Sequence, residues 1–123
     1  MQHRHISSAF DRDLEILLAL IMKMGGLVEA SIHDSALSLL ERDNALAQKV
    51  RETDDRIDAL EEEINEEAAR IIALRAPIAG DLRTVLSVMK ISSNLERCGD
   101  YAKNLAKRTS VLVQMLPIEG ASR

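Results

Sequence analysis

Apolar residues recur at alternating steps of three and four along almost the whole of the 123-residue chain. This spacing puts them on one side of an α-helix and gives each helix a seam for packing against other helices. Ser8 with Asp11 resembles a capping box that opens the first helix. Gly25 and Gly26 interrupt that helix, so we expect a kink there or a close approach of a neighbouring backbone. The first seam consists of Phe10, Leu14, Leu17, Ile21, Met24, Val28, Ile32 and Leu39.

Two further segments follow the same pattern. Asp43 or Asn44 can cap the second helix, which must end near Ala76 because the residue before a proline is driven out of the helical region. Pro77 suits the first turn of a third helix, and Asp81 favours the positive end of that helix. The second seam consists of Leu46, Val50, Thr53, Ile57, Leu60, Ile64 and Ile71. The third consists of Leu82, Val85, Leu86, Met89, Leu95, Ala102, Leu105 and Ala106, with the small residues Ser92 and Gly99 on the same side.

Three helical segments of roughly 30 residues, joined by short connections, predict an all-α antiparallel up-down-up three-helix bundle. Aromatic residues make up 2% of the chain, which has 5 glycines and 2 prolines, so the side chains and turns of a β-sandwich or barrel are missing. We expect a flexible N-terminus over residues 1–7, the bundle over residues 8–112 and a C-terminal tail over residues 113–123.

Charge and cysteine content limit the classes of partner and compartment. The formal net charge of −4 argues against nucleic acid as the main partner, because phosphate binding needs clustered Lys and Arg. The single cysteine, Cys98, cannot form an internal disulfide, and we expect it to be a buried small apolar residue. The N-terminus lacks a signal-peptide pattern, and the apolar run from Leu14 to Met24 is broken by Glu15 and Lys23. These features predict a cytoplasmic protein without a membrane span.

Two pairs of carboxylates stand beside the seams. Asp54 and Asp58 are four residues apart in the second helix, and Glu96 and Asp100 are four apart in the third. Like charges at this spacing repel one another unless a cation lies between them, and hard metal ions prefer carboxylate oxygens. A metal site and a solvated acidic face both fit the pattern. The chain has no Gly-rich phosphate loop, no nucleophile and base at a telling spacing and no paired cysteines, so we do not expect an enzyme.

Two short motifs carry a resemblance to a known family. An Arg-x-Pro-x-x-x-Asp-Leu-Arg signature falls on Arg75, Pro77, Asp81, Leu82 and Arg83. A Glu-Arg-x-Gly-Asp signature falls on Glu96, Arg97, Gly99 and Asp100. With these motifs in order, residues 5–112 resemble the PhoU family, the accessory regulators of bacterial phosphate-specific transport.

The resemblance implies a cytoplasmic, often dimeric protein that restrains phosphate uptake and phosphate-starvation signalling when phosphate is plentiful. It implies two partners, the ATP-binding subunit of the phosphate ABC transporter and the phosphate sensor histidine kinase. It also implies a bound metal ion (iron, zinc, manganese or magnesium) at the family's acidic motifs, which map to Asp54, Asp58, Glu96 and Asp100. We expect partner contacts at the signature residues Arg75, Asp81, Arg83 and Arg97.

The chain departs from the family in length, because members usually carry two such three-helix repeats. It is either a fragment or a single-repeat protein that must pair with another copy. In the second case we expect a homo-oligomer whose apolar contact surface includes Leu18, Leu27, Leu37 and Leu40. Two other readings stay open: a helical assembly module with no phosphate-linked role, and a metal-dependent hydrolase that uses the carboxylate pairs.

Overall fold

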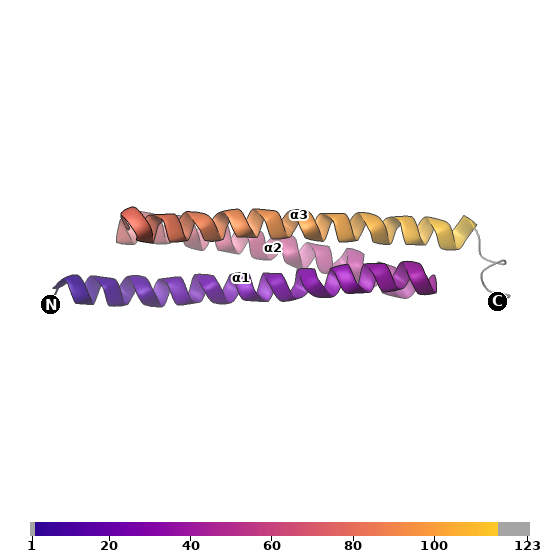
Figure 1. Ribbon diagram of the computed structural model, residues 1–123, viewed down its shortest axis with the longest axis horizontal. Helices are drawn as coiled ribbons and strands as arrows, with labels where there is room; N and C mark the ends of the chain where they lie inside the picture. The colour runs from indigo at the N-terminus through magenta and orange to yellow at the C-terminus, as the bar shows by residue number, and fades with distance from the viewer. Residues whose placement is uncertain (1, 116–123) are drawn as a thin grey trace.

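Three long helices lie lengthwise against one another in the computed structural model, which describes residues 2–115 and the side chains of residues 8–115 (Figure 1). They are α1 (Gln2–Glu41), α2 (Asn44–Arg75) and α3 (Ala79–Met115). The helix α2 runs antiparallel to α1 and α3, and each helix packs against the other two. The predicted all-α, up-down-up bundle is therefore confirmed.

The two connections between helices are set by capping and by backbone turns. The Asp43 carboxylate accepts a hydrogen bond from the backbone N–H of Leu46 at 3.0 Å, which caps α2 as predicted. At its other end, Ala76 adopts a left-handed conformation with φ 45° and stops the helix, also as predicted. Pro77 lies in the connection rather than in the first turn of α3, because the chain turns again at Ala79, where φ is 50°.

Helix α1 differs from the prediction at two places. It begins at Gln2, and the Ser8 hydroxyl accepts a hydrogen bond from Arg12 instead of capping the helix. It also runs unbroken through Gly25 and Gly26, where an added Cβ would meet nothing within 4 Å. The expected kink or close approach is therefore wrong, because both glycines lie off the face that packs on the other helices. The predicted flexibility of residues 1–7 stays a prediction.

The predicted C-terminal tail begins later than expected. Helix α3 continues to Met115, so the first three residues of the 113–123 segment are helical. The rest of that segment lies outside the described residues.

One half of the bundle is filled with large apolar side chains and the other half with small ones. The large group includes Phe10, Leu17, Met24, Val28, Ile57, Leu60, Ile64, Ile71, Val85 and Val88. The small group comprises Ala47, Val50, Ala102 and Ala106, next to the buried Ser31, Ser35, Ser38 and Thr109. The helices α1 and α3 are joined in this second half by a 3.3 Å hydrogen bond from the Ser38 hydroxyl to the Thr109 hydroxyl.

Parts of the predicted seams are not in the core. Ile32 and Leu86, both assigned to seams, are 48% exposed. Beyond Val28, the buried face of α1 passes through the three serines instead of Ile32 and Leu39, because a straight helix with 3.6 residues per turn drifts away from a seven-residue repeat. Cys98 is exposed rather than buried.

The helix α1 is consequently apolar on a second side as well. Among the described helices it is the one that is long and apolar enough to cross a membrane, by length and composition, over Ser8–Glu41. Of the most apolar 18 consecutive residues in that stretch, only 28% are buried inside the bundle. Leu18 and Leu40 are exposed, as expected for a contact surface, whereas Leu37 is half-buried and Leu27 packs against the core.

Candidate functional site

The predicted metal ligands gather where α2 and α3 lie side by side. These helices are antiparallel, and the middle turns of α2 lie beside the middle turns of α3, so carboxylates from both helices meet there. The Lys103 ammonium lies among them, 3.1 Å from Asp54 Oδ2 and 3.8 Å from Asp100 Oδ1. We call this set the acidic cluster: Asp54, Asp58 and Glu61 from α2, with Glu96, Asp100 and Lys103 from α3.

A glycine in α3 allows the two helices to approach at this level. A Cβ added to Gly99 would lie 3.2 Å from Ile57 Cδ1 and 3.7 Å from Asp54 Oδ1. The absence of a side chain at Gly99 therefore permits this close packing. It places the backbone of α3 directly against the buried Asp54 side chain, whose residue is 2% exposed.

The electrostatics of the acidic cluster oppose full ionisation. Partial burial raises the pKa of Asp58, of Glu61 and of Glu96 above their ordinary values. The negative charge of Asp54 raises the pKa of Asp58 further, and Glu61 does the same for Glu96. The carboxyl groups of Asp58 and Glu96 also share a hydrogen bond, which favours a retained proton on Glu96. The cluster therefore binds a positive charge or a proton favourably.

Lys103 supplies that positive charge in the structure. Its hydrogen bond to Asp54 raises the pKa of the Lys103 ammonium, so the lysine is charged. The other carboxylate oxygen of Asp54, Oδ1, is buried and has no hydrogen-bond partner among the described residues. Lys103 therefore contacts one carboxylate oxygen of Asp54, and the other oxygen remains available to another donor or cation.

The donor chemistry of the acidic cluster fits a hard metal ion, because every candidate ligand is a carboxylate and one buried oxygen lacks a partner. In residues 8–115, however, no three His, Cys, Asp or Glu side chains are arranged so that they could hold a metal ion. The ammonium of Lys103 lies where a cation bridging Asp54 and Asp100 would compete with it. The metal-ligand assignment of Asp54, Asp58, Glu96 and Asp100 stays a prediction.

The predicted partner-binding residues do not form one site. Arg75 lies at the end of α2, and its Nε donates to Asp13 Oδ2 at 2.7 Å, so it already serves as a contact between helices. Asp81 and Arg83 are exposed in the first turns of α3 at the same end of the bundle. Arg97 is exposed about 20 Å further along the helix, given 1.5 Å per residue. Their predicted role in partner binding is untested.

Two charged residues were missed by reasoning from the sequence. One is Lys103, whose position three residues after Asp100 is the signal that could have identified it. The other is Asp13, which is 7% exposed and receives hydrogen bonds from Arg75 and from Arg70 Nη2 at 2.8 Å. These two guanidinium groups lower the pKa of Asp13. An acid between Phe10 and Leu17 on an apolar seam was the signal for this pair of contacts.

Comparison with known proteins assigns the chain to a family. A family model described as the PhoU domain matches residues 21–109, a span that contains the whole acidic cluster. The chain belongs to the PhoU family. The resemblance seen in the two sequence motifs is thereby confirmed.

Individual PhoU relatives support this assignment. The chain is 50% identical over 114 residues to a "Phosphate-specific transport system accessory protein PhoU homolog" of Zymomonas mobilis, covering 93% of this chain and 48% of the relative. It is 41% identical over 119 residues to a protein of the same description from Caulobacter vibrioides, covering 97% and 52%. The crystal structure of PhoU from Pseudomonas aeruginosa superposes with a TM-score of 0.85 at 42% identity, over 86% of this chain and 51% of that one. The chain spans about half the length of these relatives.

Proposed function

We propose that this chain acts in the regulation of phosphate uptake and of phosphate-starvation signalling. The observation that carries the proposal is the PhoU-domain match over residues 21–109. The relatives' description as accessory proteins of the phosphate-specific transport system supports a link to phosphate transport. Because these relatives are described as accessory proteins, a regulatory role is favoured over a catalytic one.

In this proposal the chain works on the cytoplasmic side by contact with other proteins. The partners are the ATP-binding subunit of the phosphate ABC transporter and the phosphate sensor histidine kinase, and occupancy of one excludes the other. The exposed Asp81 side chain in the first turn of α3 supports this mode, because it forms no ion pair within residues 8–115. Self-association of the chain is part of the same proposal.

Co-purification tests the partner contacts. The tagged chain is recovered from its source cells grown with high and with low phosphate, and bound proteins are identified by mass spectrometry. We expect the transporter ATPase or the sensor kinase in the recovered material, in amounts that change with phosphate supply. The variant Asp81→Ala should lose them, whereas Glu62→Ala on the exposed side of α2 should not. Recovery of neither partner by the unchanged chain would favour a helical assembly module without a phosphate-linked role.

We further propose that the acidic cluster holds a metal ion, with Asp54, Asp58, Glu96 and Asp100 as its ligands. Bound metal would neutralise the carboxylates and stabilise the contact between α2 and α3. Among this chain's residues, Lys103 then acts as an internal competitor, since its ammonium pairs with Asp54 at 3.1 Å.

Thermal unfolding with and without Mn²⁺ tests the metal proposal. A ligand that binds only the folded state raises the midpoint of unfolding. We expect Mn²⁺ to raise it, and to raise it further in Lys103→Met, where the competing ammonium is removed. Glu96→Gln with Asp100→Asn should abolish the Mn²⁺ effect and keep the helical fold. If Mn²⁺ stabilises neither the unchanged chain nor Lys103→Met, the acids form a lysine-neutralised face and no metal site.

A further inference from the structure

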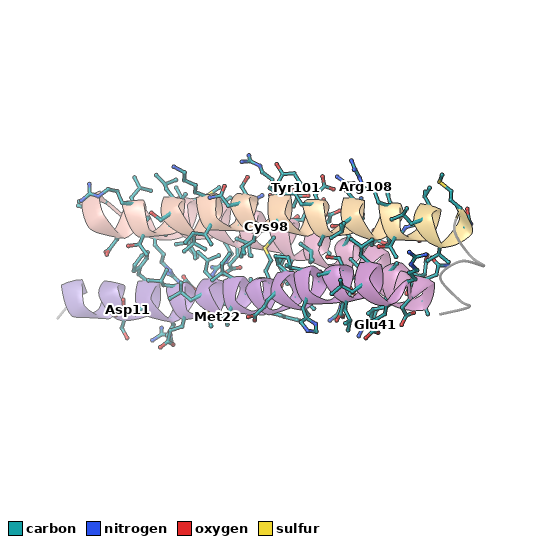
Figure 2. All side chains as sticks on the ribbon, turned by 45° about the vertical axis from the view of Figure 1, so that its right-hand side comes forward. Asp11, Met22, Glu41, Cys98, Tyr101 and Arg108 are labelled. Carbon is teal, nitrogen blue, oxygen red and sulfur yellow. The ribbon has the colours of Figure 1, made fainter. Side chains whose placement is uncertain are left out.

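The surface formed by α1 and α3 on the side away from α2 is apolar and has no partner among residues 8–115. We call it the α1/α3 face. Ile32 and Ala36 of α1, with Cys98, Tyr101 and Leu105 of α3, line a groove of about 260 Å³ in this face. Figure 2 shows Cys98 on the side of α3 that faces α1. Among the described residues of α2, only Leu74 is a strongly exposed large apolar side chain, so the apolar surface is confined to the other two helices.

Opposite charges border the two sides of this face. Helix α1 carries the exposed acids Glu15 and Glu29, fourteen residues apart. Helix α3 carries the exposed bases Arg83, Lys90 and Arg97, seven residues apart. Residues spaced by seven lie on the same side of a helix, so the bases form a row along α3. None of these five side chains forms an ion pair within the described part of the chain.

The acids of α1 lie at the same levels as the bases of α3. The Ser92 hydroxyl contacts Met24 Sδ at 3.5 Å, and the Ser38 hydroxyl contacts Thr109 at 3.3 Å. Residues of α1 and α3 that lie at the same level along the bundle therefore differ by 68 in residue number at the first contact and by 71 at the second. Both helices run in the same direction (Figure 1). Glu29 consequently lies within about one helical turn of the level of Arg97, and Glu15 within about one turn of the level of Arg83.

We propose that two copies of this chain pair through their α1/α3 faces about a two-fold axis parallel to the helices. This proposal deepens the self-association included in the proposed function and rests on it. Rotation about such an axis places α1 of one copy opposite α3 of the other and leaves the position of each residue along the helix direction unchanged. Glu29 then meets the partner's Arg97, and Glu15 meets the partner's Arg83. A two-fold axis across the helices would instead lay α1 on α1 and bring acids against acids.

The size of the face suits a stable dimer. Two adjacent helices packed about 9 Å apart present a face roughly 18 Å wide and about 45 Å long over 30 residues, or about 800 Å². A standard specific interface buries about 800 Å² on each partner. The apolar groove would form the centre of such an interface, and the charged rows would form its rim and set its register.

Charge reversal tests this arrangement, with light scattering and sedimentation equilibrium as readouts. The unchanged chain should be a dimer. Glu29→Arg and Arg97→Glu should each weaken the dimer on the order of tenfold or more, because each variant places two like-charge pairs in its own interface. Mixed in equal amounts, the two variants should form a heterodimer, since both contacts between unlike copies are then between opposite charges. Glu62→Arg on α2 is the matched control and should leave the dimer unchanged. Circular dichroism checks that each variant is folded.

Each other outcome has a distinct meaning. A dimer that resists both reversals overturns the α1/α3 interface but keeps the proposed self-association. A monomer at all concentrations overturns both. Co-sedimentation of a monomeric chain with phosphatidylcholine vesicles, abolished by Leu18→Gln with Met22→Gln, would show that the face binds lipid and would overturn the dimer. The partner contacts with the transporter ATPase are tested separately, so their failure does not decide this one.

Discussion

Among the described residues, buried acids join the helices of this protein at two places, and in both cases the counter-charge comes from another helix. Asp13 of α1 is held by Arg70 and Arg75 near the end of α2. Asp54 of α2 is held by Lys103 of α3. Each acid is more than nine-tenths buried, so removal of its counter-charge would leave an uncompensated group in the core.

The contribution of Asp13 to stability can be measured directly. We expect Asp13→Asn to lower the free energy of unfolding by about 1–3 kcal/mol, since it removes charge-assisted hydrogen bonds to two arginines that remain partly exposed. Urea denaturation gives this value. The control is Asp11→Asn, an exposed position two residues earlier, which should change stability by less than about 0.5 kcal/mol. Equal effects at both positions would contradict the assigned role of Asp13.

At the scale of the helix, α1 is distinguished by its two apolar sides. The core side passes through Phe10, Leu17, Met24 and Val28, and then through buried serines. The outer side bears Leu18, Met22, Ile32 and Leu40, all more than 40% exposed. The core side packs against the other two helices. The exposed outer side makes α1 more apolar than its burial in the bundle requires.

The two glycines in the middle of α1 offer a test of this description. We expect Gly25→Ala and Gly26→Ala each to raise the free energy of unfolding by about 0.5–1 kcal/mol, because alanine loses less backbone entropy in a helix. Neither position has an atom near enough to clash with a new methyl group. Gly99→Ala is the matched comparison, and its gain should be smaller because its Cβ would lie 3.2 Å from Ile57 Cδ1. Thermal or urea unfolding measures all three, and destabilisation by Gly25→Ala would mean that α1 bends there.

At the scale of the whole molecule, acids with opposite pKa shifts govern the dependence of stability on pH. The raised pKa values of Asp58, Glu61 and Glu96 mean that the folded state takes up protons more readily than the unfolded state. Their contribution is fully present below their ordinary values of 3.8 and 4.5 and is lost as pH rises through the raised values. Asp13 behaves in the opposite way: its contribution is present above 3.8 and is lost as pH falls through its lowered value.

The sum predicts a stability maximum at mildly acidic pH. The midpoint of thermal unfolding should rise as pH is lowered from 7 through the raised pKa values of the acidic cluster, since the folded state takes up protons there. It should fall below 3.8, where the unfolded chain binds the proton that the lowered pKa of folded Asp13 resists. Scanning calorimetry over this range measures the profile. Glu96→Gln should flatten the rise on the neutral side and leave the acid-side fall. A midpoint that decreases steadily from pH 7 to 5 in the unchanged chain would contradict the shared burial of these carboxylates.

Much of the architecture could be predicted from local chemistry. The three-and-four spacing identified all three helices, Asp43 identified the start of α2, and the residue before Pro77 identified its end. These features depend on residues close together in the chain, for which helix geometry and backbone sterics suffice. The PhoU signatures were also readable, because their residues lie in two short runs.

Tertiary structure decided which face of each helix is buried and which counter-charge each acid has. Ile32 and Ser31 lie in the same turn of α1. A seven-residue repeat does not predict which of the two is buried, because the buried face of a straight helix drifts relative to that repeat. The sequence by itself determined the helices, both ends of α2, the family and the presence of paired acids. Only the rotation and relative level of the packed helices decided that Asp54 pairs with Lys103 and that Asp13 pairs with two arginines, because those contacts join residues far apart in the chain. The same packing decided that the second apolar stripe of α1 is exposed.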